Sequence, residues 1–321
     1  MSRAINCNKG ANWSGEFVFL WPADFFARFA TFYSPPVRLS GILFPCGTSL
    51  RADVSSSGCL LMIDIHCHLL PGLDDGPDTL EESLQMAEMA IIDGITHVIA
   101  TPHANDTYPF LPEMVQKRRD EIQARIGNRL VLATGCDFHL SFENIQDLRK
   151  HPAKYTLNQK NYLLIEFADF SIPPTIDNTL HELHLSGLRL IVTHPERNAL
   201  IRANPVRLAG WVRQGCRVQV TALSLLGRFG RSAQESAEWL LDHDAIHFIA
   251  SDAHNTSARG RPLLLRDAFN FVTERRGASV ARALFHDNPL AAFEGRPLPY
   301  SPDPPDVEAP ASPKRRRFWF F

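Results

Sequence analysis

The chain has 321 residues, of which 45% are hydrophobic and 21% are charged, and its formal net charge is −2. This composition excludes a mainly disordered chain, and the nearly neutral charge excludes a broad basic surface for nucleic acid or anionic lipid. The length is sufficient for one large core or two smaller ones.

Residues 1–61 differ from the middle of the chain. They hold ten of the 31 aromatic residues, and they carry five Lys/Arg against three Asp/Glu. Their most apolar stretch, residues 17–33, is interrupted by Pro22, Asp24 and Arg28, so it predicts neither a membrane span nor a signal peptide. We predict that 1–61 is a non-native or disordered N-terminal extension. An interaction segment that uses its aromatic residues on a partner is the alternative.

From Met62 onward, short β-rich runs alternate with amphipathic helical windows. Thr79 and Glu82 fit a capping box, Gly94 fits the turn that ends the same helix, and Asn204 before Pro205 marks another helix start. The predicted strands are 63–66, 98–101, 130–133, 162–167, 190–193, 218–221 and 247–251, and the predicted helices are 79–93, 112–126, 143–150, 175–186, 205–214, 232–242 and 262–276. Seven β/α units predict an α/β fold with a parallel sheet, either open or closed into a barrel.

Polar residues at the strand ends favour the barrel. Six of the seven predicted strands deliver a histidine or a carboxylate at or just after the carboxyl end. A barrel gathers these ends in a ring, whereas an open sheet spreads them along one edge. The residues concerned are His66, His68, Asp75, His103, Asp137, Glu166, His194, Asp252 and His254.

Each of these residues also has an ordinary structural interpretation. A His-x-His pair is often coincidental, His103 follows Thr-Pro as a turn residue would, and Asp252 could cap a helix. However, strand alternation points His66 and His68 to the same side, and Glu166 at the end of an apolar strand needs a partner to offset its desolvation. One shared metal site explains the whole set more simply than separate coincidences.

The residues from 62 to about 298 resemble the polymerase and histidinol phosphatase (PHP) family. Within it, they are most similar to the bacterial manganese-dependent protein-tyrosine phosphatases of capsule and exopolysaccharide operons. The resemblance implies a distorted seven-stranded (β/α) TIM-like barrel. It rests on Asp64-Ile65-His66-Cys67-His68, Leu70-Pro71-Gly72-Leu73-Asp74-Asp75-Gly76, Ala100-Thr101-Pro102-His103, His194-Pro195-Glu196-Arg197, Gln219-Val220-Thr221-Ala222 and Ser251-Asp252-Ala253-His254.

The resemblance also implies a three-metal site. His66, His68 and Asp252 would hold the first metal, Asp137 would bridge it to a second held by Glu166 and His194, and Asp75, His103 and His254 would hold the third. The family usually has Glu where this chain has Asp137, so the bridging carboxylate is one methylene shorter. Manganese is the expected metal, and a His/carboxylate set also suits Fe or Zn²⁺.

The expected reaction is hydrolysis of a phosphotyrosine ester by a water that two metals acidify. Arg197 and Arg259 resemble the family's phosphate-binding arginines, and His103 or His254 could instead protonate the leaving group. The Cys-x5-Arg signature of cysteine-dependent phosphatases is missing after Cys67, Cys136 and Cys216. The implied substrate and partner is the phosphorylated tyrosine-rich tail of a bacterial tyrosine kinase.

Other functions remain open. They are a PHP phosphatase of a small-molecule phosphoester, such as a histidinol-phosphatase-like enzyme, an amidohydrolase-type metal hydrolase, and a non-catalytic scaffold. The six cysteines lack a C-x-x-C pair, which favours free thiols and a cytoplasmic protein without stable membrane insertion. We predict a catalytic domain over 62–300 and a disordered tail over 301–321, which is Pro-rich and ends in basic and aromatic residues.

Overall fold

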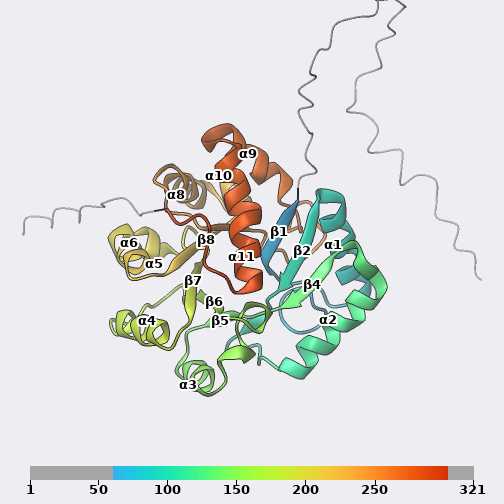
Figure 1. Ribbon diagram of the computed structural model, residues 1–321, viewed down its shortest axis with the longest axis horizontal. Coiled ribbons are helices and arrows are strands. Elements are labelled where there is room, and N and C mark those ends of the chain that lie inside the picture. The colour runs from blue at the N-terminus through green and yellow to red at the C-terminus, as the bar shows by residue number, and fades with distance from the viewer. Residues whose placement is uncertain (1–60, 303–321) are drawn as a thin grey trace, which may run out of the picture. The chain divides into compact units, whose positions relative to one another are not determined.

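The computed structural model describes residues 61–302, which Figure 1 shows as coloured ribbon. The predicted N-terminal extension, up to residue 60, and residues 303–321 of the predicted tail lie outside the described residues. Among the described residues, none of the helices combines the length and the apolar character needed to span a membrane.

The strands of the described residues pair only in parallel and form two sheets. One sheet has the order β1-β2-β4, and the other has the order β3-β5-β6-β7-β8-β9. The strands are β1 Met62–Cys67, β2 Ile95–Ala100, β3 His103–Ala104, β4 Val131–Thr134, β5 Asp137–His139, β6 Tyr162–Glu166, β7 Arg189–Thr193, β8 Arg217–Thr221 and β9 Phe248–Ala250. The predicted α/β fold with parallel strands is confirmed, but one closed seven-stranded barrel is not.

The division into two sheets has a local cause. Strands β2 and β3 are separated only by Thr101 and Pro102, and β4 and β5 only by Gly135 and Cys136. Proline has no N–H to donate, so it interrupts a ladder in the middle of a strand run. The predicted second and third strands therefore each continue beyond a break, and their second halves pair in the other sheet.

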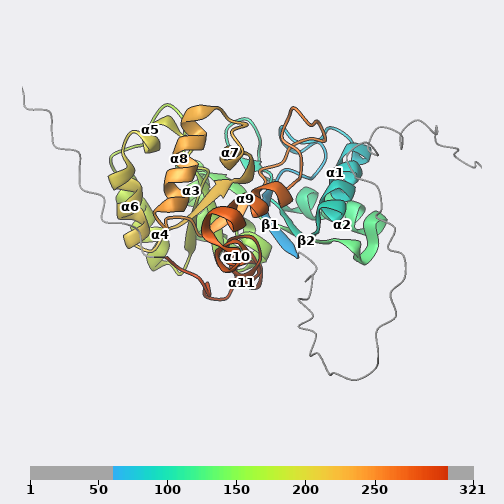
Figure 2. The same cartoon turned by 90° about the horizontal axis from the view of Figure 1, so that it is seen from above.

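Helices flank the sheets on two sides. In both Figure 1 and Figure 2, α1 and α2 lie on one flank and α4, α5, α6 and α8 lie on the other. The helices are α1 Leu80–Asp93, α2 Pro112–Ile126, α3 Phe142–Lys150, α4 Ile176–Leu185, α5 Ala199–Arg202, α6 Pro205–Arg213, α7 Ala222–Leu225, α8 Arg231–Asp242, α9 Arg266–Arg276, α10 Ala278–Arg282 and α11 Asn288–Glu294.

The predicted helix boundaries are largely confirmed by their caps. Thr79 and Glu82 form the capping box of α1, Gly94 ends it in the left-handed conformation, and Asn204 caps α6. The predicted helix 262–276 begins later, at Arg266, because the Asp93 carboxylate accepts hydrogen bonds from the N–H groups of Leu265 and Arg266 (2.6 and 2.9 Å). The segment with α10 and α11 was not predicted.

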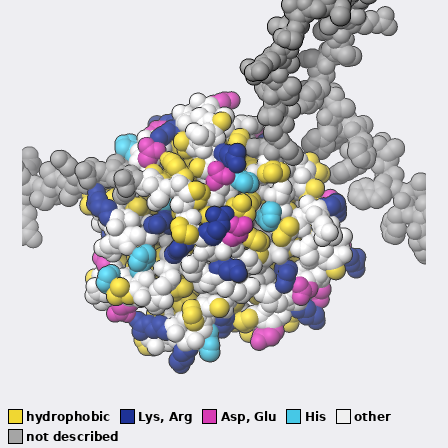
Figure 3. All heavy atoms as spheres, in the orientation of Figure 1, with side chains coloured by type: hydrophobic (Ala, Val, Ile, Leu, Met, Phe, Trp, Pro, Cys, Tyr) yellow, Lys and Arg dark blue, Asp and Glu magenta, His cyan; other side chains and the backbone are white. Residues whose placement is uncertain are grey.

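Burial agrees with sheets that are covered on both faces. Every residue of β1 is buried, as are most residues of the other central strands. This pattern is expected for parallel strands between layers of helices. The face drawn in Figure 3, which α11 crosses in Figure 1, mixes basic, acidic and hydrophobic side chains. The core thus fixes the strand ends from which the site is built.

One buried histidine of this core should make stability depend on pH. The His247 ring accepts a hydrogen bond from the Val218 N–H (3.2 Å), and burial together with the nearby Arg217 lowers the pKa of His247 to about 3. Between pH 6.5 and 3, the unfolded chain binds a proton here and the native chain does not. As the pH falls through this window, the free energy of unfolding should therefore fall by up to about 1.4 kcal/mol per pH unit because of His247.

Urea unfolding between pH 7 and 4, in the presence of a chelator, measures this slope. We expect a shallower slope for His247→Asn, which keeps an acceptor but does not titrate. The exposed His181→Asn serves as the matched control. Equal slopes for wild type and His247→Asn would contradict the assignment.

Candidate metal centre

The nine predicted ligands come from six strands but lie in one region. His66 is near the end of β1, His103 and Asp137 begin β3 and β5, and Glu166 ends β6. Asp252 and His254 follow β9, and the Asp252 N–H donates to the His66 carbonyl oxygen (2.9 Å). His103 and Asp137 also lie three residues after the carboxyl ends of β2 and β4. The carboxyl ends of neighbouring parallel strands share one edge, which explains why residues so distant in sequence meet.

His66 and His68 form the centre of the cluster. Their Nε2 atoms are 3.3 Å apart, and both imidazoles are fully buried. The His66 Nδ1 is 2.9 Å from Gln219 Oε1, and the His68 Nδ1 is 2.6 Å from Asp74 Oδ2. These oxygens are acceptors, so each Nδ1 carries a proton, and each ring in its neutral form presents a lone pair at Nε2.

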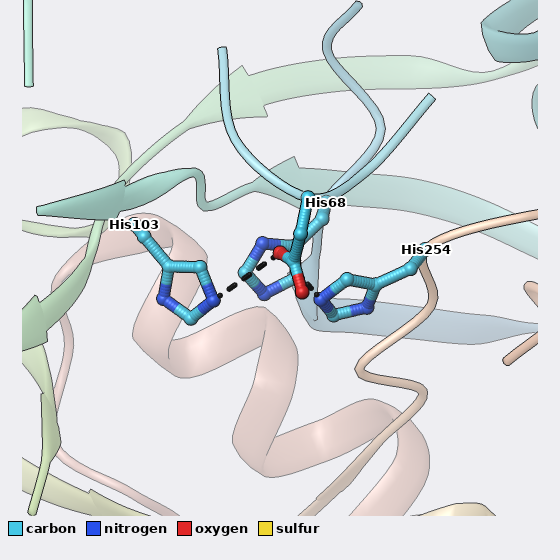
Figure 4. A group of neighbouring side chains, drawn as sticks. His68, His103 and His254 are labelled. Carbon is cyan, nitrogen blue, oxygen red and sulfur yellow. Dashed lines mark ion pairs between the residues drawn. The ribbon is translucent and has the colours of Figure 1, made fainter. Parts of the chain in front are cut away.

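A second group surrounds the Asp75 carboxylate. Its Oδ1 is 3.4 Å from His103 Nε2 and 3.1 Å from His254 Nε2, the two ion pairs drawn as dashed lines in Figure 4. The His254 Nδ1 donates to the Asp252 carbonyl oxygen (2.9 Å). The neutral His254 ring therefore also turns an Nε2 lone pair toward a carboxylate.

A third group contains Asp137, Glu166 and His194. Asp137 Oδ2 is 3.4 Å from His66 Nε2 and 3.3 Å from His103 Nδ1, yet both Asp137 oxygens are buried without a hydrogen bond. Glu166 Oε2 is 3.5 Å from His103 Nδ1, and its Oε1 is 3.6 Å from His194 Nε2. Asp137 thus lies between the other two groups.

These contacts fit metal ions. Imidazole lone pairs and carboxylate oxygens repel one another when they converge in a dry site, and only protons or cations between them remove that cost. The buried atoms without a hydrogen bond include the Asp137 oxygens and His254 Nε2. Three sets have ligand atoms within 4.8 Å of one another: His68, Asp75, His103 and His254; His66, His68 and Asp137; and His103, Asp137 and Glu166.

The cluster departs in detail from the predicted grouping of ligands. His68 lies in two of the three sets, and so does His103, which was predicted for the third metal alone. Asp252 Oδ1 is 3.5 Å from the Nε2 atoms of both His66 and His68, in agreement with the predicted first group. The structure therefore brings all nine predicted ligands together, although the division among metals remains a prediction.

Charge in the cluster follows from burial and from the carboxylates. Burial opposes the charged form of His66, but Asp137 and Asp252 raise the pKa of His66 to about 9. Burial and Arg197 lower the pKa of His194 to about 3. Burial and Asp137 raise the pKa of Glu166 to about 7. Without metal, the cluster therefore holds protons that cations would have to displace.

The two predicted arginines are placed differently. The Arg197 guanidinium donates to Asp252 Oδ2 and lies over the Phe229 ring, with Cζ 4.4 Å from the ring centroid. The Arg259 side chain is exposed, and within residues 61–302 it forms no ion pair. Arg261 instead reaches the cluster, with Nη2 3.1 Å from Asp75 Oδ2 and Nη1 3.6 Å from Asp252 Oδ2.

Sequence reasoning assigned no role to four supporting residues. Gln219 and Asp74 orient the rings of His66 and His68, and Arg261 pairs with Asp75. The fully buried Asp64 accepts hydrogen bonds from the Ser251 hydroxyl and N–H (2.5 and 3.0 Å), which joins β1 to the end of β9 across 187 positions. A polar residue inside an apolar strand, as in Ile63-Asp64-Ile65 and Val218-Gln219-Val220, was the available signal.

Two predicted ligands also have unusual backbone conformations. His194 and Asp252 have φ values of 31° and 51°, in the left-handed region that residues other than glycine rarely adopt. Such conformations persist where the surroundings impose them, and they occur frequently at functional sites. His194 directly follows β7, and Asp252 lies two residues after the end of β9. The turn at each position therefore aims the side chain into the cluster.

The three described cysteines lie apart from this chemistry. Cys67, Cys136 and Cys216 are buried free thiols, and burial raises the pKa of all three. A thiol with a raised pKa is a poor nucleophile near neutral pH. These thiols are therefore packing residues, and they are free, as the cysteine spacing predicts.

A cluster of histidines and carboxylates at the carboxyl ends of parallel strands defines a candidate polynuclear centre of the metal-dependent hydrolase class. The profile of a family described as Capsular polysaccharide synthesis, CpsB/CapC, matches residues 62–294. The chain belongs to this family.

Relatives from other bacteria share this region. The tyrosine-protein phosphatase YwqE of Bacillus subtilis is 38% identical over 202 residues, which cover 62% of this chain and 79% of YwqE. The putative tyrosine-protein phosphatase CapC of Staphylococcus aureus is 33% identical over 65% of this chain and 82% of CapC. A solved structure also matches, with a TM-score of 0.70 and 32% identity over 77% of this chain and 100% of that chain. It belongs to a study of YwqE from Bacillus subtilis and CpsB from Streptococcus pneumoniae, which are described there as metal-dependent tyrosine phosphatases.

Proposed function

We propose that the protein is a metal-dependent protein-tyrosine phosphatase. Its substrate would be the phosphotyrosine tail of a bacterial tyrosine kinase in capsular or exopolysaccharide synthesis. The observation that carries this proposal is the convergence of imidazole lone pairs and unpaired carboxylate oxygens around Asp137. The phosphatase relatives that share this region support it.

The nine predicted ligands would hold the metals, with Mn²⁺ as the expected ion and Fe or Zn²⁺ as alternatives. Bound metal ions would supply positive charge for the phosphoryl oxygens and acidify a water. Asp74 and Gln219 keep the rings of His68 and His66 in the ligating tautomer. The bonds that join β1 to the residues after β9, including His68 N–H to the Ala253 oxygen (2.8 Å), support a distorted barrel of the PHP type as the frame of this site.

Positively charged side chains would orient the phosphate. Arg197 lines a pocket of about 340 Å³ together with Glu166, His194 and Phe229. A guanidinium matches phosphate oxygens with two parallel hydrogen bonds. Arg197 therefore holds the ester at the edge of the cluster, while the Asp252 carboxylate keeps the guanidinium in place.

The leaving oxygen must gain a proton, and His103 and His254 are the predicted donors. The Nδ1 proton of His254 is already committed to the Asp252 carbonyl oxygen. Burial opposes the charged form of His103, but its contacts with Asp137 and Asp75 raise its pKa to about 11. His103 therefore carries a proton in the metal-free cluster, whereas a ring nitrogen that ligates a metal has no proton to donate.

Phosphotyrosine peptide hydrolysis by the full chain with Mn²⁺ tests the proposed function. We expect release of inorganic phosphate, loss of activity in His66→Ala, and retention of activity in Cys216→Ala. Vanadate at concentrations that block cysteine phosphatases should not inhibit. Loss of activity in Cys216→Ala with an unaffected His66→Ala variant would refute the proposal. The buried free thiols support the proposed cytoplasmic location.

The two arginines of the loop after β9 provide a further prediction. Arg261→Ala should lower kcat/KM for a phosphotyrosine peptide by about a hundredfold, because it removes a charge that faces Asp75 and Asp252. Arg259→Ala, its exposed neighbour, is the matched control and should change kcat/KM by less than about threefold. Steady-state kinetics of both variants check this. A larger loss in Arg259→Ala would favour the original assignment from the sequence.

A further inference from the structure

A second pocket lies beside the metal centre, between α5, α6 and α8. Its volume is about 360 Å³, and its apolar wall is formed by Ile201, Leu208, Trp239 and Leu240. In Figures 1 and 2 these three helices lie together on the flank opposite α1. The hydrolysis proposed above uses none of these four side chains.

This apolar pocket is adjacent to the pocket that contains Arg197. Both are lined by Arg202 and Ser232, and the pocket on the metal side also contains Glu166 and His194. Arg202 is fixed at the junction, because its Nη1 donates to the carbonyl oxygens of Glu196 and Arg197 (3.0 and 2.6 Å). A peptide bound at the metal centre would pass over Arg202 to reach the apolar pocket.

The pocket is built by the core rather than by mobile surface side chains. Ile201, Leu208 and Leu240 are only 3–5% exposed, and the partly exposed Trp239 stacks on His243 with ring centroids 4.2 Å apart. Ser236 and the exposed Glu235 form part of a polar rim. A preformed apolar hollow with a few polar groups at its edge binds an apolar side chain and fixes its orientation.

We propose that the pocket between α5, α6 and α8 is a specificity subsite. It would receive an aromatic or aliphatic side chain of the substrate peptide, close in sequence to the phosphotyrosine. This inference rests on the proposed function, since it requires a phosphotyrosine at the metal centre. Binding of a residue remote from the reacting phosphate would favour peptides with an apolar neighbour over free phosphotyrosine.

The test fills the pocket in the full-length, Mn²⁺-loaded protein. Ser236→Phe places a ring in the pocket, and Ser279→Phe makes the same substitution at an exposed position on α10. The substrates are free phosphotyrosine and a series of phosphotyrosine peptides in a glycine–serine background. A single leucine or tyrosine stands one, two or three residues before or after the phosphotyrosine. The measured quantity is the ratio of kcat/KM for the peptide to kcat/KM for free phosphotyrosine.

In the wild type and in Ser279→Phe, we expect at least one position of the apolar residue to raise this ratio by about tenfold above the ratio for the glycine–serine peptide. Ser236→Phe should abolish that rise, and so should Trp239→Ala, which removes one wall and guards against misfolding of the first variant. Activity on free phosphotyrosine reports that each variant is folded.

The outcomes separate the two proposals. A wild-type protein that hydrolyses no phosphotyrosine substrate refutes the proposed function. A wild-type protein that hydrolyses all peptides with the same ratio as glycine–serine peptides refutes the subsite alone. The subsite would also be refuted if Ser236→Phe and Trp239→Ala both left the ratio unchanged, even where a variant altered the oligomeric state.

Discussion

Asp137→Asn should lower kcat/KM for a phosphotyrosine peptide by about a thousandfold, the upper range for removal of one preorganised group. Asp137 is fully buried, and its two oxygens lack hydrogen bonds while facing His66 and His103. The amide keeps the shape but loses the charge, and its NH₂ group cannot ligate a metal. Steady-state kinetics and metal content by mass spectrometry measure the two effects.

Asp137→Glu is the control for this experiment. It keeps the charge and has the residue that the resembled family usually carries, so metal binding should survive. The extra methylene in a packed site lowers the stability by roughly 1–3 kcal/mol, and the activity should fall far less than in Asp137→Asn because the ligating carboxylate is kept. If Asp137→Asn retains its full metal content and activity, Asp137 is not the bridging ligand.

Removal of metal should abolish activity and leave a folded but less stable protein. The cluster would then lose the cations that offset its converging carboxylates. At metal concentrations a thousandfold above Kd, bound metal stabilises the native state by about 4 kcal/mol, and a chelator removes that contribution. Dialysis against a chelator, followed by activity and thermal unfolding measurements, tests this, and Mn²⁺ should restore both.

The reloading step should depend on pH. Asp137 and Asp252 overcome burial and raise the pKa of His66 to about 9 in the metal-free protein, so this ring must lose a proton before it ligates. Apparent metal affinity should therefore rise between pH 7 and 9. Full activity in a sample without detectable metal would overturn the metal-dependent mechanism.

The sequence predicted the elements that local patterns determine. Continuous apolar runs located the strands, and the capping box at Thr79 and Glu82 located the start of α1. The polar cluster could be predicted for a related reason, because His66, Glu166 and His194 interrupt or follow runs that are otherwise apolar. Polar residues at such positions need partners, and the partners were each other.

Features that depend on distant contacts could not be predicted. The start of α9 depends on the Asp93 carboxylate, which lies more than 170 positions away. The position of Arg261 beside Asp75 depends on a loop in which Asn255 Oδ1 accepts hydrogen bonds from the N–H groups of Ser257 and Arg261. This turn brings Arg261 back beside His254, whose N–H donates to the Arg261 carbonyl oxygen. Sequence spacing alone does not indicate that return.

The bonds between Asp64 and Ser251 have a consequence for how the protein matures during synthesis. These residues are 187 positions apart, and His254 lies three residues further on. A nascent chain can bring His103, Asp137 and Glu166 together early, but it cannot complete the cluster until nearly all of residues 62–254 have left the ribosome. Closing so long a loop is slow, since its entropy is lost before the contacts form. Uptake of the complete set of metals would thus mark the end of folding, and a chain truncated before Asp252 would remain inactive.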